Sequence, residues 1–337
     1  VAEAALGHDE IAEFYRARGY APIFTGQDDD DAARRAALYR ALAAASLHGL
    51  PAARYSAADL RSAFAAVGGA ADRGRAEVTA ARLFIAYAQH LQSGVLEPGR
   101  AVPGILRSAP RREPAKLLSD LAGPDPAAVL RGLVPSSREY ARLLAARLRL
   151  EAVRAAGGWG AEVPGTRLDP GDAGPSVVAL RDRMIAMGYL RPTARARYDG
   201  SLTAAVLAFQ RDHGLEADGI AGPATIAAVN VGVEARIAQL LVAMERERWL
   251  NLPEGLGTRH VLVNLTDFHA RVVDDGVVSF ETKAVVGADH SGKETPEFSD
   301  VMEYMELNPT WTVPRGILGR DYLPRLQRNR GAASYLQ

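Results

Sequence analysis

The sequence predicts a multidomain α+β protein, with an α-helical scaffold, a three-helix module and a β-rich last domain. Alanine divides the chain, because 57 of its 62 alanines precede Asn251. Alanine has the best intrinsic helix propensity and is depleted in strands, so the residues before Asn251 should be mostly helical and the rest should differ. A length of 337 residues exceeds what one hydrophobic core usually holds, which favours two or three domains.

The composition excludes several classes of protein. With 40 basic and 40 acidic residues, the chain lacks the basic excess that a nucleic-acid partner requires. A hydrophobic fraction of 48% argues against global disorder. The sequence contains no run of about 18 uncharged apolar residues, so no membrane span is predicted. The sequence has no cysteine, which excludes disulfides, thiolate metal sites and a cysteine nucleophile from these residues.

Helical periodicity dominates the first half of the chain. It predicts helices over residues 8–18, 32–47, 57–67, 77–93, 115–121, 127–133 and 136–155. Residues 94–114 are rich in Gly, Pro and Arg and are predicted to form a loop, and the glycines of 157–165 form a linker. The acidic run Asp28–Asp31 favours a helix cap over a cation site, and His90 is interpreted as a packed structural histidine.

A small repeat-like module follows. Helices are predicted over 176–187, over 201–212 and from Pro223, and two Asp-Gly pairs form turns before helices. The stretches from Tyr198 to Gln210 and from Asp218 to Thr225, with His213-Gly-Leu between them, resemble the bacterial three-helix peptidoglycan-binding domain. The resemblance implies affinity for glycan strands or stem peptides, although many such modules act as spacers. The peptidoglycan-binding candidates are Tyr198, Asp199, Phe209, Gln210 and Asp218.

The spacing of apolar residues changes from helical to alternating after a last amphipathic helix over 234–250. Alternation predicts strands over 260–265, 268–273, 277–286 and 299–307, and Asp274-Asp275-Gly276 is a hairpin signal. An antiparallel sheet is therefore expected.

Further motifs extend the resemblance over most of the chain. They are Met244-Glu-Arg-Glu-Arg-Trp249, Val263-Asn264, Val285-Val-Gly287, Thr295-Pro-Glu-Phe-Ser299, Asn308-Pro-Thr-Trp-Thr-Val-Pro314, Asp321-Tyr-Leu-Pro324, Tyr335-Leu336, and the early His48-Gly-Leu50 and Tyr55. Together they resemble the large L,D-transpeptidases of the Gram-negative periplasm. The resemblance implies a helical scaffold over 1–165, a peptidoglycan-binding domain over 166–232, a returning scaffold helix over 233–250 and a partial catalytic domain over 251–337.

The resemblance also implies a chemistry. Members of this family form 3→3 cross-links between stem peptides through a cysteine acyl-enzyme, with the cysteine in a Ser-His-Gly-Cys motif. Neither that motif nor any cysteine stands in this sequence, so no catalytic residue is assigned here. Two explanations remain open: a catalytic end beyond Gln337, which we favour because a half-sheet would expose its edges, or a pseudoenzyme. The substrate-cleft candidates are Trp311, Asn308, Thr295, Tyr304 and Tyr322.

The expected partners are stem peptides and glycan strands, without nucleic acid, membrane span, metal or cofactor, and the expected state is a monomer. The resemblance places the protein in the periplasm after removal of a signal peptide, and makes it a determinant of cell shape and a carbapenem target. A non-catalytic wall-binding scaffold is the main alternative. A cell-wall hydrolase is a weaker one, because it would need His and Asp metal-ligand clusters that the sequence does not show.

Overall fold

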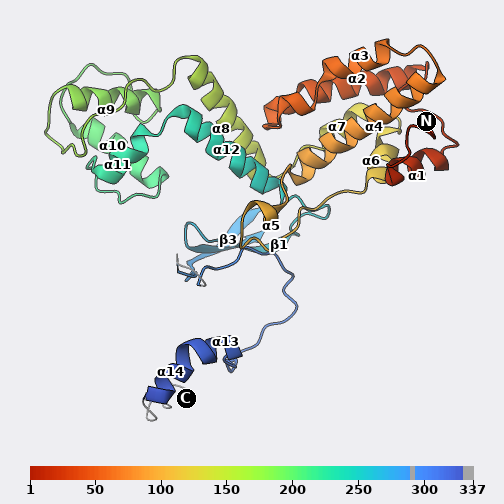
Figure 1. Ribbon diagram of the computed structural model, residues 1–337. Coiled ribbons are helices and arrows are strands. Elements are labelled where there is room, and N and C mark those ends of the chain that lie inside the picture. Colours follow the sequence, from red (N-terminus) through yellow and green to blue (C-terminus); the bar gives the residue numbers. More distant parts are fainter. Residues whose placement is uncertain (289–292, 329–337) are drawn as a thin grey trace. The chain divides into compact units, whose positions relative to one another are not determined.

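The computed structural model describes residues 1–288 and 293–328 and consists of many helices followed by a three-stranded antiparallel sheet (Figure 1). The predicted α+β fold class is thereby confirmed. The chain forms two compact units, Val1–Glu297 and Phe298–Gln337, and each is described by itself. Tyr335 and Leu336, which contributed to the resemblance, lie outside the described residues.

The scaffold helices begin at the signals that the sequence provides. Asp28 caps α2 (Asp29–Ala43) by accepting a hydrogen bond of 2.7 Å from the Asp31 amide, so the predicted cap is confirmed. Asp31 in turn pairs with Arg34 at 2.5 Å. The other scaffold elements are α1 (Asp9–Ala17), η1 (Ala45–His48), η2 (Ala52–Arg54), α3 (Ala57–Ala65), α4 (Ala70–Ser93), α5 (Pro98–Ala101), α6 (Pro114–Leu121), α7 (Pro126–Gly132) and α8 (Arg138–Ala155).

Several boundaries differ from the prediction, and α2, for example, spans Asp29–Ala43 where the sequence predicts a helix over 32–47. Helix α4 begins at Ala70, seven residues before the predicted start at Glu77, and it includes Gly74. A Cβ at Gly74 would lie 2.7 Å from the backbone nitrogen of Val1, so this glycine permits close packing of the chain's first residue. The predicted loop over 94–114 contains the short helix α5, which starts at a proline.

A buried carboxylate organises the scaffold core. Glu77 of α4 is fully buried and accepts hydrogen bonds from the Tyr15 hydroxyl at 2.6 Å, the Ile23 amide at 2.6 Å and the Thr25 amide at 2.8 Å. The Phe24 amide and the Thr25 hydroxyl also donate to it. Burial, followed by the charge of Glu77, raises the pKa of Tyr15 far above its usual range, so the phenol stays protonated as a donor. This carboxylate therefore fixes the segment between α1 and α2 against α4.

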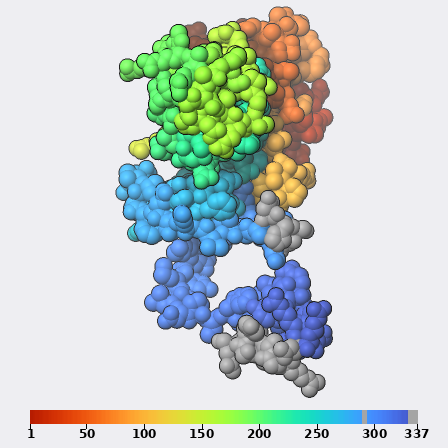
Figure 2. Space-filling model, turned by 90° about the vertical axis from the view of Figure 1, so that its left-hand side faces the viewer, coloured from red at the N-terminus to blue at the C-terminus, as the bar shows by residue number. Residues whose placement is uncertain are grey.

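The three-helix module has a hydrophobic core of its own. Its helices are α9 (Pro175–Ala186), α10 (Gly200–Asp212) and α11 (Pro223–Asn230). Leu180, Met184, Leu202, Val206 and Phe209 are buried together, at the helical spacing read from the sequence. The module, in green, faces the viewer in Figure 2. After it, α12 (Val233–Arg248) packs along α8, and the two helices run side by side in Figure 1.

The sheet consists of β1 (Arg259–Asn264), β2 (His269–Asp274) and β3 (Val277–Lys283), in that order and antiparallel. Asp275 at φ 49° and Gly276 at φ 76° form the hairpin between β2 and β3, as the Asp-Asp-Gly signal predicts. The β2–β3 register shifts between Val272 and Val273. β3 ends at Lys283, three residues before the predicted Val286.

The predicted fourth strand over 299–307 is wrong, because these described residues form no strand. Alternation of apolar residues supplies a pattern, but a strand also needs a hydrogen-bonding neighbour. Glu297, just before this segment, forms a parallel bridge with Ile105 instead. The second unit then contains α13 (Arg315–Ile317), the π-helical turn η3 (Leu318–Tyr322) and α14 (Leu323–Arg328).

In the part of the chain that the structure describes, no single helix has the length and apolar character needed to cross a membrane. Helices α11 and α12 meet those criteria only when taken as a pair, which is bent by 84°.

The role of Glu77 can be tested by substitution. Glu77→Gln would turn an amide NH2 toward backbone amides, leaving buried donors unsatisfied, and we expect it to cost about 3 kcal/mol of unfolding free energy. Urea denaturation followed by far-UV circular dichroism measures this. Glu13→Gln, at an exposed position of α1, is the matched control and should change little. Equal stability of the two variants would contradict the assigned role.

Candidate functional site

Gln210 of α10 organises the loop between α10 and α11. Its Nε2 donates to Asp218 Oδ1 at 2.9 Å, and also to the Ile220 carbonyl and the Thr225 hydroxyl. Its Oε1 accepts from the Gly219 amide at 2.9 Å. The side chain is only 1% exposed, so its amide replaces water as the partner of these groups.

Gly219 is held in the same loop by a second buried side chain. The Tyr198 hydroxyl donates to the Gly219 carbonyl at 2.9 Å. Gly219 has φ 75°, and a Cβ there would lie 2.8 Å from Thr203 Cγ2. The second Asp-Gly pair is therefore required both for backbone conformation and for space.

Asp199 makes a second set of hydrogen bonds in the module, at the start of α10. It caps α10 by accepting from the Leu202 amide at 3.1 Å, and it pairs with Arg181 at 2.9 Å and Arg195 at 3.2 Å. The hydrogen bond from Arg181 is the largest of the contacts that hold the pKa of Asp199 well below its usual range. Arg181 is itself buried, so this carboxylate compensates an interior charge.

These contacts sort the predicted peptidoglycan-binding residues into two groups. Tyr198, Phe209 and Gln210 are buried, and their side chains face the interior of the module. Asp199 is partly exposed and Asp218 is exposed. We assign the three buried residues to the fold of the module, while a binding role for any of the five stays a prediction. From the sequence, Gln210 is predicted only as a binding candidate, although its position on the apolar face of a predicted helix, four residues after Val206, is a signal for a structural role.

The end of α12 joins different parts of the first unit. Arg248, which is 2% exposed, donates to the His48 carbonyl and, at 3.0 Å, to the Tyr140 hydroxyl. It also pairs with Glu245 at 3.2 Å, whose other oxygen accepts from the Leu96 amide at 2.8 Å. The guanidinium lies over the Tyr140 ring, 5.4 Å from its centroid.

The neighbouring residues of this helix end contact the segment that precedes the second unit. Both carboxylate oxygens of Glu297 accept from Arg246 at 2.6 Å, and the Glu297 amide donates to the Gly104 carbonyl at 2.9 Å. Trp249 is buried with Ile105 and Ala109. The sequence singled out the motif over 244–249, but not these partners, because they lie far along the chain.

Thr295 is the one substrate-cleft candidate in the first unit. Its hydroxyl accepts from the Gly287 amide at 2.6 Å, so two segments of the family resemblance meet here. A Cβ at Gly287 would lie 2.1 Å from the Lys293 carbonyl, which explains the glycine. The contact fixes the position of the Thr295 hydroxyl but does not by itself test a role in substrate binding.

The other four candidates belong to the second unit. Tyr304 is 80% exposed and Trp311 is 64% exposed. Asn308 has φ 52°, a conformation that asparagine adopts more readily than most residues, and Tyr322 ends the π-helical turn η3. Their contact with a substrate stays a prediction.

The sheet of the first unit presents apolar side chains on its surface. Val261, Leu262, Val278 and Phe280 are all exposed. His269 lies within 4 Å of Asp267 and Glu281, but both carboxylates also pair with Arg271. Over residues 1–288 and 293–328, no group of three or more His, Cys, Asp or Glu side chains is arranged to hold a metal ion.

Comparison with known families assigns three regions of the chain. A scaffold-domain family model matches residues 9–146, a peptidoglycan-binding-domain model matches 173–229, and a model of the YkuD L,D-transpeptidase catalytic domain matches 258–336. No curated protein matched the chain. The order of the three domains is the architecture that the sequence resemblance implies, and the resemblance is therefore confirmed.

A substitution at Gln210 separates a structural role from a binding role. Gln210→Leu would leave the Gly219 amide and its neighbours without partners, and we expect it to destabilise the module by about 3 kcal/mol. Exposed Arg211→Gln is the control. Peptidoglycan pull-down at a temperature where both variants are folded, verified by circular dichroism, should give equal binding. A loss of binding by folded Gln210→Leu would assign Gln210 a direct role.

The histidine beside Arg248 predicts a dependence of stability on pH. Burial, then the charges of Arg248 and Arg147, lower the pKa of His48, so the unfolded chain binds this proton more readily than the folded one. Stability should be complete above about pH 6.5, the unfolded pKa, and should fall as the pH drops toward 5. Burial lowers the pKa of His90 and His213 in the same direction.

Two measurements check this. Urea denaturation between pH 7.5 and pH 5 gives the slope, which His48→Gln should reduce. NMR titration of the ring protons gives the pKa of His48 directly, and a value at or above that of a free histidine would contradict the prediction.

Proposed function

We propose that this chain, a member of the family of large L,D-transpeptidases, serves in forming 3→3 cross-links between peptidoglycan stem peptides. The observation that carries the proposal is the presence of an L,D-transpeptidase catalytic domain and a peptidoglycan-binding domain in one chain. The catalytic-domain match indicates the class of reaction, and the peptidoglycan-binding-domain match indicates the polymer on which it acts. The scaffold-domain match completes the same architecture.

The proposed reaction is acyl transfer through a thioester. A cysteine thiolate attacks the carbonyl of the third residue of a donor tetrapeptide, and the terminal D-Ala leaves with its amine. The amine of an acceptor stem then attacks the thioester and restores the thiol. Paired histidine and backbone amides would activate the thiolate and hold the oxyanion. Because the chain contains no cysteine, the nucleophile of this proposal lies outside residues 1–337.

The described residues would serve binding and positioning in this scheme. The contact of Arg246 with Glu297 ties α12 to the segment that contains Thr295. The Thr295 hydroxyl is in turn held by the Gly287 amide. These contacts support the proposal that the end of α12 positions the segment that follows the sheet of the catalytic domain. We further propose a periplasmic location, a contribution to cell shape and inhibition by carbapenems, since a thiolate attacks strained acyl groups.

A second candidate function is a non-catalytic peptidoglycan-binding scaffold. The specific observation in its favour is the absence of cysteine from a chain that matches the catalytic-domain model. The coding sequence after Gln337 distinguishes the two candidates, since a Ser-His-Gly-Cys motif there supports the enzyme and a stop codon supports the scaffold.

The enzymatic proposal makes a prediction for muropeptides. In a strain whose other L,D-transpeptidase genes are deleted, the gene encoding this chain should produce 3→3 cross-linked dimers, detectable by mass spectrometry of digested peptidoglycan. A Cys→Ser exchange in its Ser-His-Gly-Cys motif should abolish them. Dimers that persist after that exchange, or that never form with the intact gene, would contradict the proposal.

The assignment of the nucleophile has a separate test. The 337-residue chain incubated with a carbapenem should keep its unmodified intact mass, because it contains no thiol. The full-length protein should gain one acyl adduct under the same conditions. An adduct on the 337-residue chain would place the reactive group among the residues described above.

A further inference from the structure

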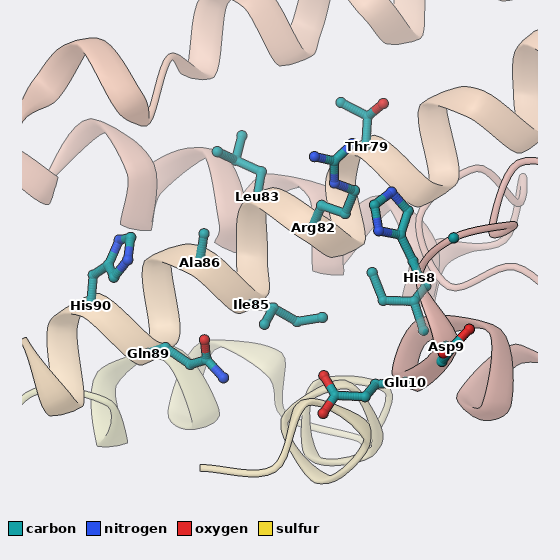
Figure 3. Close-up of a pocket in the computed structure, with 12 residues that line it drawn as sticks. His8, Asp9, Glu10, Thr79, Arg82, Leu83, Ile85, Ala86, Gln89 and His90 are labelled. Carbon is teal, nitrogen blue, oxygen red and sulfur yellow. The ribbon is translucent and has the colours of Figure 1, made fainter. Parts of the chain in front are cut away.

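A groove of about 900 Å³ lies on the scaffold, between the start of α1 and one face of α4 (Figure 3). Helix α4 contributes Arg82, Gln89 and His90, and the start of α1 contributes His8, Asp9 and Glu10. Figure 3 shows the Glu10 carboxylate turned toward the space between the helices, while the Gln89 amide donates to the Arg112 carbonyl at 3.2 Å. The groove belongs neither to the module nor to the sheet.

The floor of the groove is apolar. Leu83, Ile85 and Ala86 of α4 are partly buried there, and Ile11 of α1 is buried. These side chains remain accessible enough to line the groove, so a ligand with methyl groups would gain by covering them. The groove thus combines a hydrophobic surface with charged groups at its rim.

Three charged side chains of the rim have no partner among the described residues. Across the described ranges 1–288 and 293–328, the side chains of Arg82, Asp9 and Glu10 make no hydrogen bond and no ion pair. By contrast, Arg75 of α4 pairs with Asp72. Asp9 and Glu10 stand in the first turn of α1, where the helix dipole favours acidic residues. A cation and two carboxylates that form no ion pair, placed around one groove, suit a ligand that carries both a carboxylate and an amine.

The length of the groove limits the ligand further. The lining residues of α4 run from Thr79 to His90, and twelve helical residues span about 18 Å at 1.5 Å each. An extended tetrapeptide spans about 14 Å. A short peptide therefore fits along the lining residues of α4.

We propose that this groove binds the peptide stem of peptidoglycan, with Arg82 pairing to a stem carboxylate and Glu10 to the amine of a diamino acid. This inference rests on the proposed function, which brings peptidoglycan to the chain. The alanine methyl groups of the stem would cover Leu83 and Ala86, which lie three residues apart on one face of α4. The scaffold would then be a second contact point for the polymer besides the module, and two weak contacts on one chain raise the overall affinity.

The experiment uses the 337-residue chain and a fluorescently labelled tetrapeptide stem with a diamino acid at its third position. Fluorescence anisotropy gives the dissociation constant. Arg82→Gln and Glu10→Gln should each weaken binding by about three- to tenfold, the loss of one exposed charge-assisted contact. The matched controls are Arg73→Gln on α4 and Glu13→Gln on α1, which are exposed and do not line the groove. Circular dichroism verifies that all four variants are folded.

Modified peptides identify the contacts. A stem peptide with amidated carboxylates should bind the wild type weakly, and Arg82→Gln should weaken its binding no further. The same should hold for a peptide with an acetylated side-chain amine and Glu10→Gln. Such non-additivity is expected only if the removed groups touch each other. Independent, additive losses would overturn the assigned pairs.

The remaining outcomes separate this inference from the proposed function. If whole peptidoglycan binds but the groove variants match their controls, the groove inference is wrong and the proposed function stands. If neither the stem peptide nor whole peptidoglycan binds, and the intact gene yields no 3→3 cross-links, both are wrong. If Arg82→Gln changes the sedimentation of the chain without peptide, a second copy occupies the groove and the inference is again overturned.

Discussion

The first unit depends on one buried guanidinium, Arg248 at the end of α12. A charge withdrawn from water is tolerated only when hydrogen bonds replace its hydration. Arg248 obtains them from the His48 carbonyl after α2, from the Tyr140 hydroxyl on α8 and from Glu245 on its own helix. Because each partner comes from a different segment, the hydrogen bonds that solvate this one charge also hold those segments together.

The end of α12 also contacts the segment just before the second unit. Side chains two residues apart on a helix point about 200° away from each other, so the side chains of Arg246 and Arg248 lie on opposite faces of α12. Arg248 faces the scaffold, and Arg246 pairs with Glu297, just before the second unit. Trp249 adds the apolar contact with Ile105. Little more than one turn of helix therefore contacts both the scaffold and Glu297, which lies within the range 258–336 that the catalytic-domain model matches.

The module illustrates how sequence motifs can have a structural basis. Its most recognisable residues include Tyr198, Phe209 and Gln210, and all three are buried. Tyr198 and Gln210 hold the Asp-Gly loop, while Phe209 packs against Tyr189 and His213. Motifs of this kind identify the domain because its small core tolerates few alternatives. Surface residues of the module are under no comparable packing constraint, so they are less conspicuous in the sequence.

Local physics determined what the sequence alone could predict. The apolar period placed the helices and three strands, the Asp28 carboxylate capped α2, and Asp275-Gly276 formed the hairpin. Tertiary structure decided the rest, since it depends on partners far along the chain. Segment 299–307 has a strand pattern but forms no strand, while Glu297 bonds to Arg246. The groove between α1 and α4 exists only because the folded chain brings Glu10 and Arg82 to one surface, which no local pattern encodes.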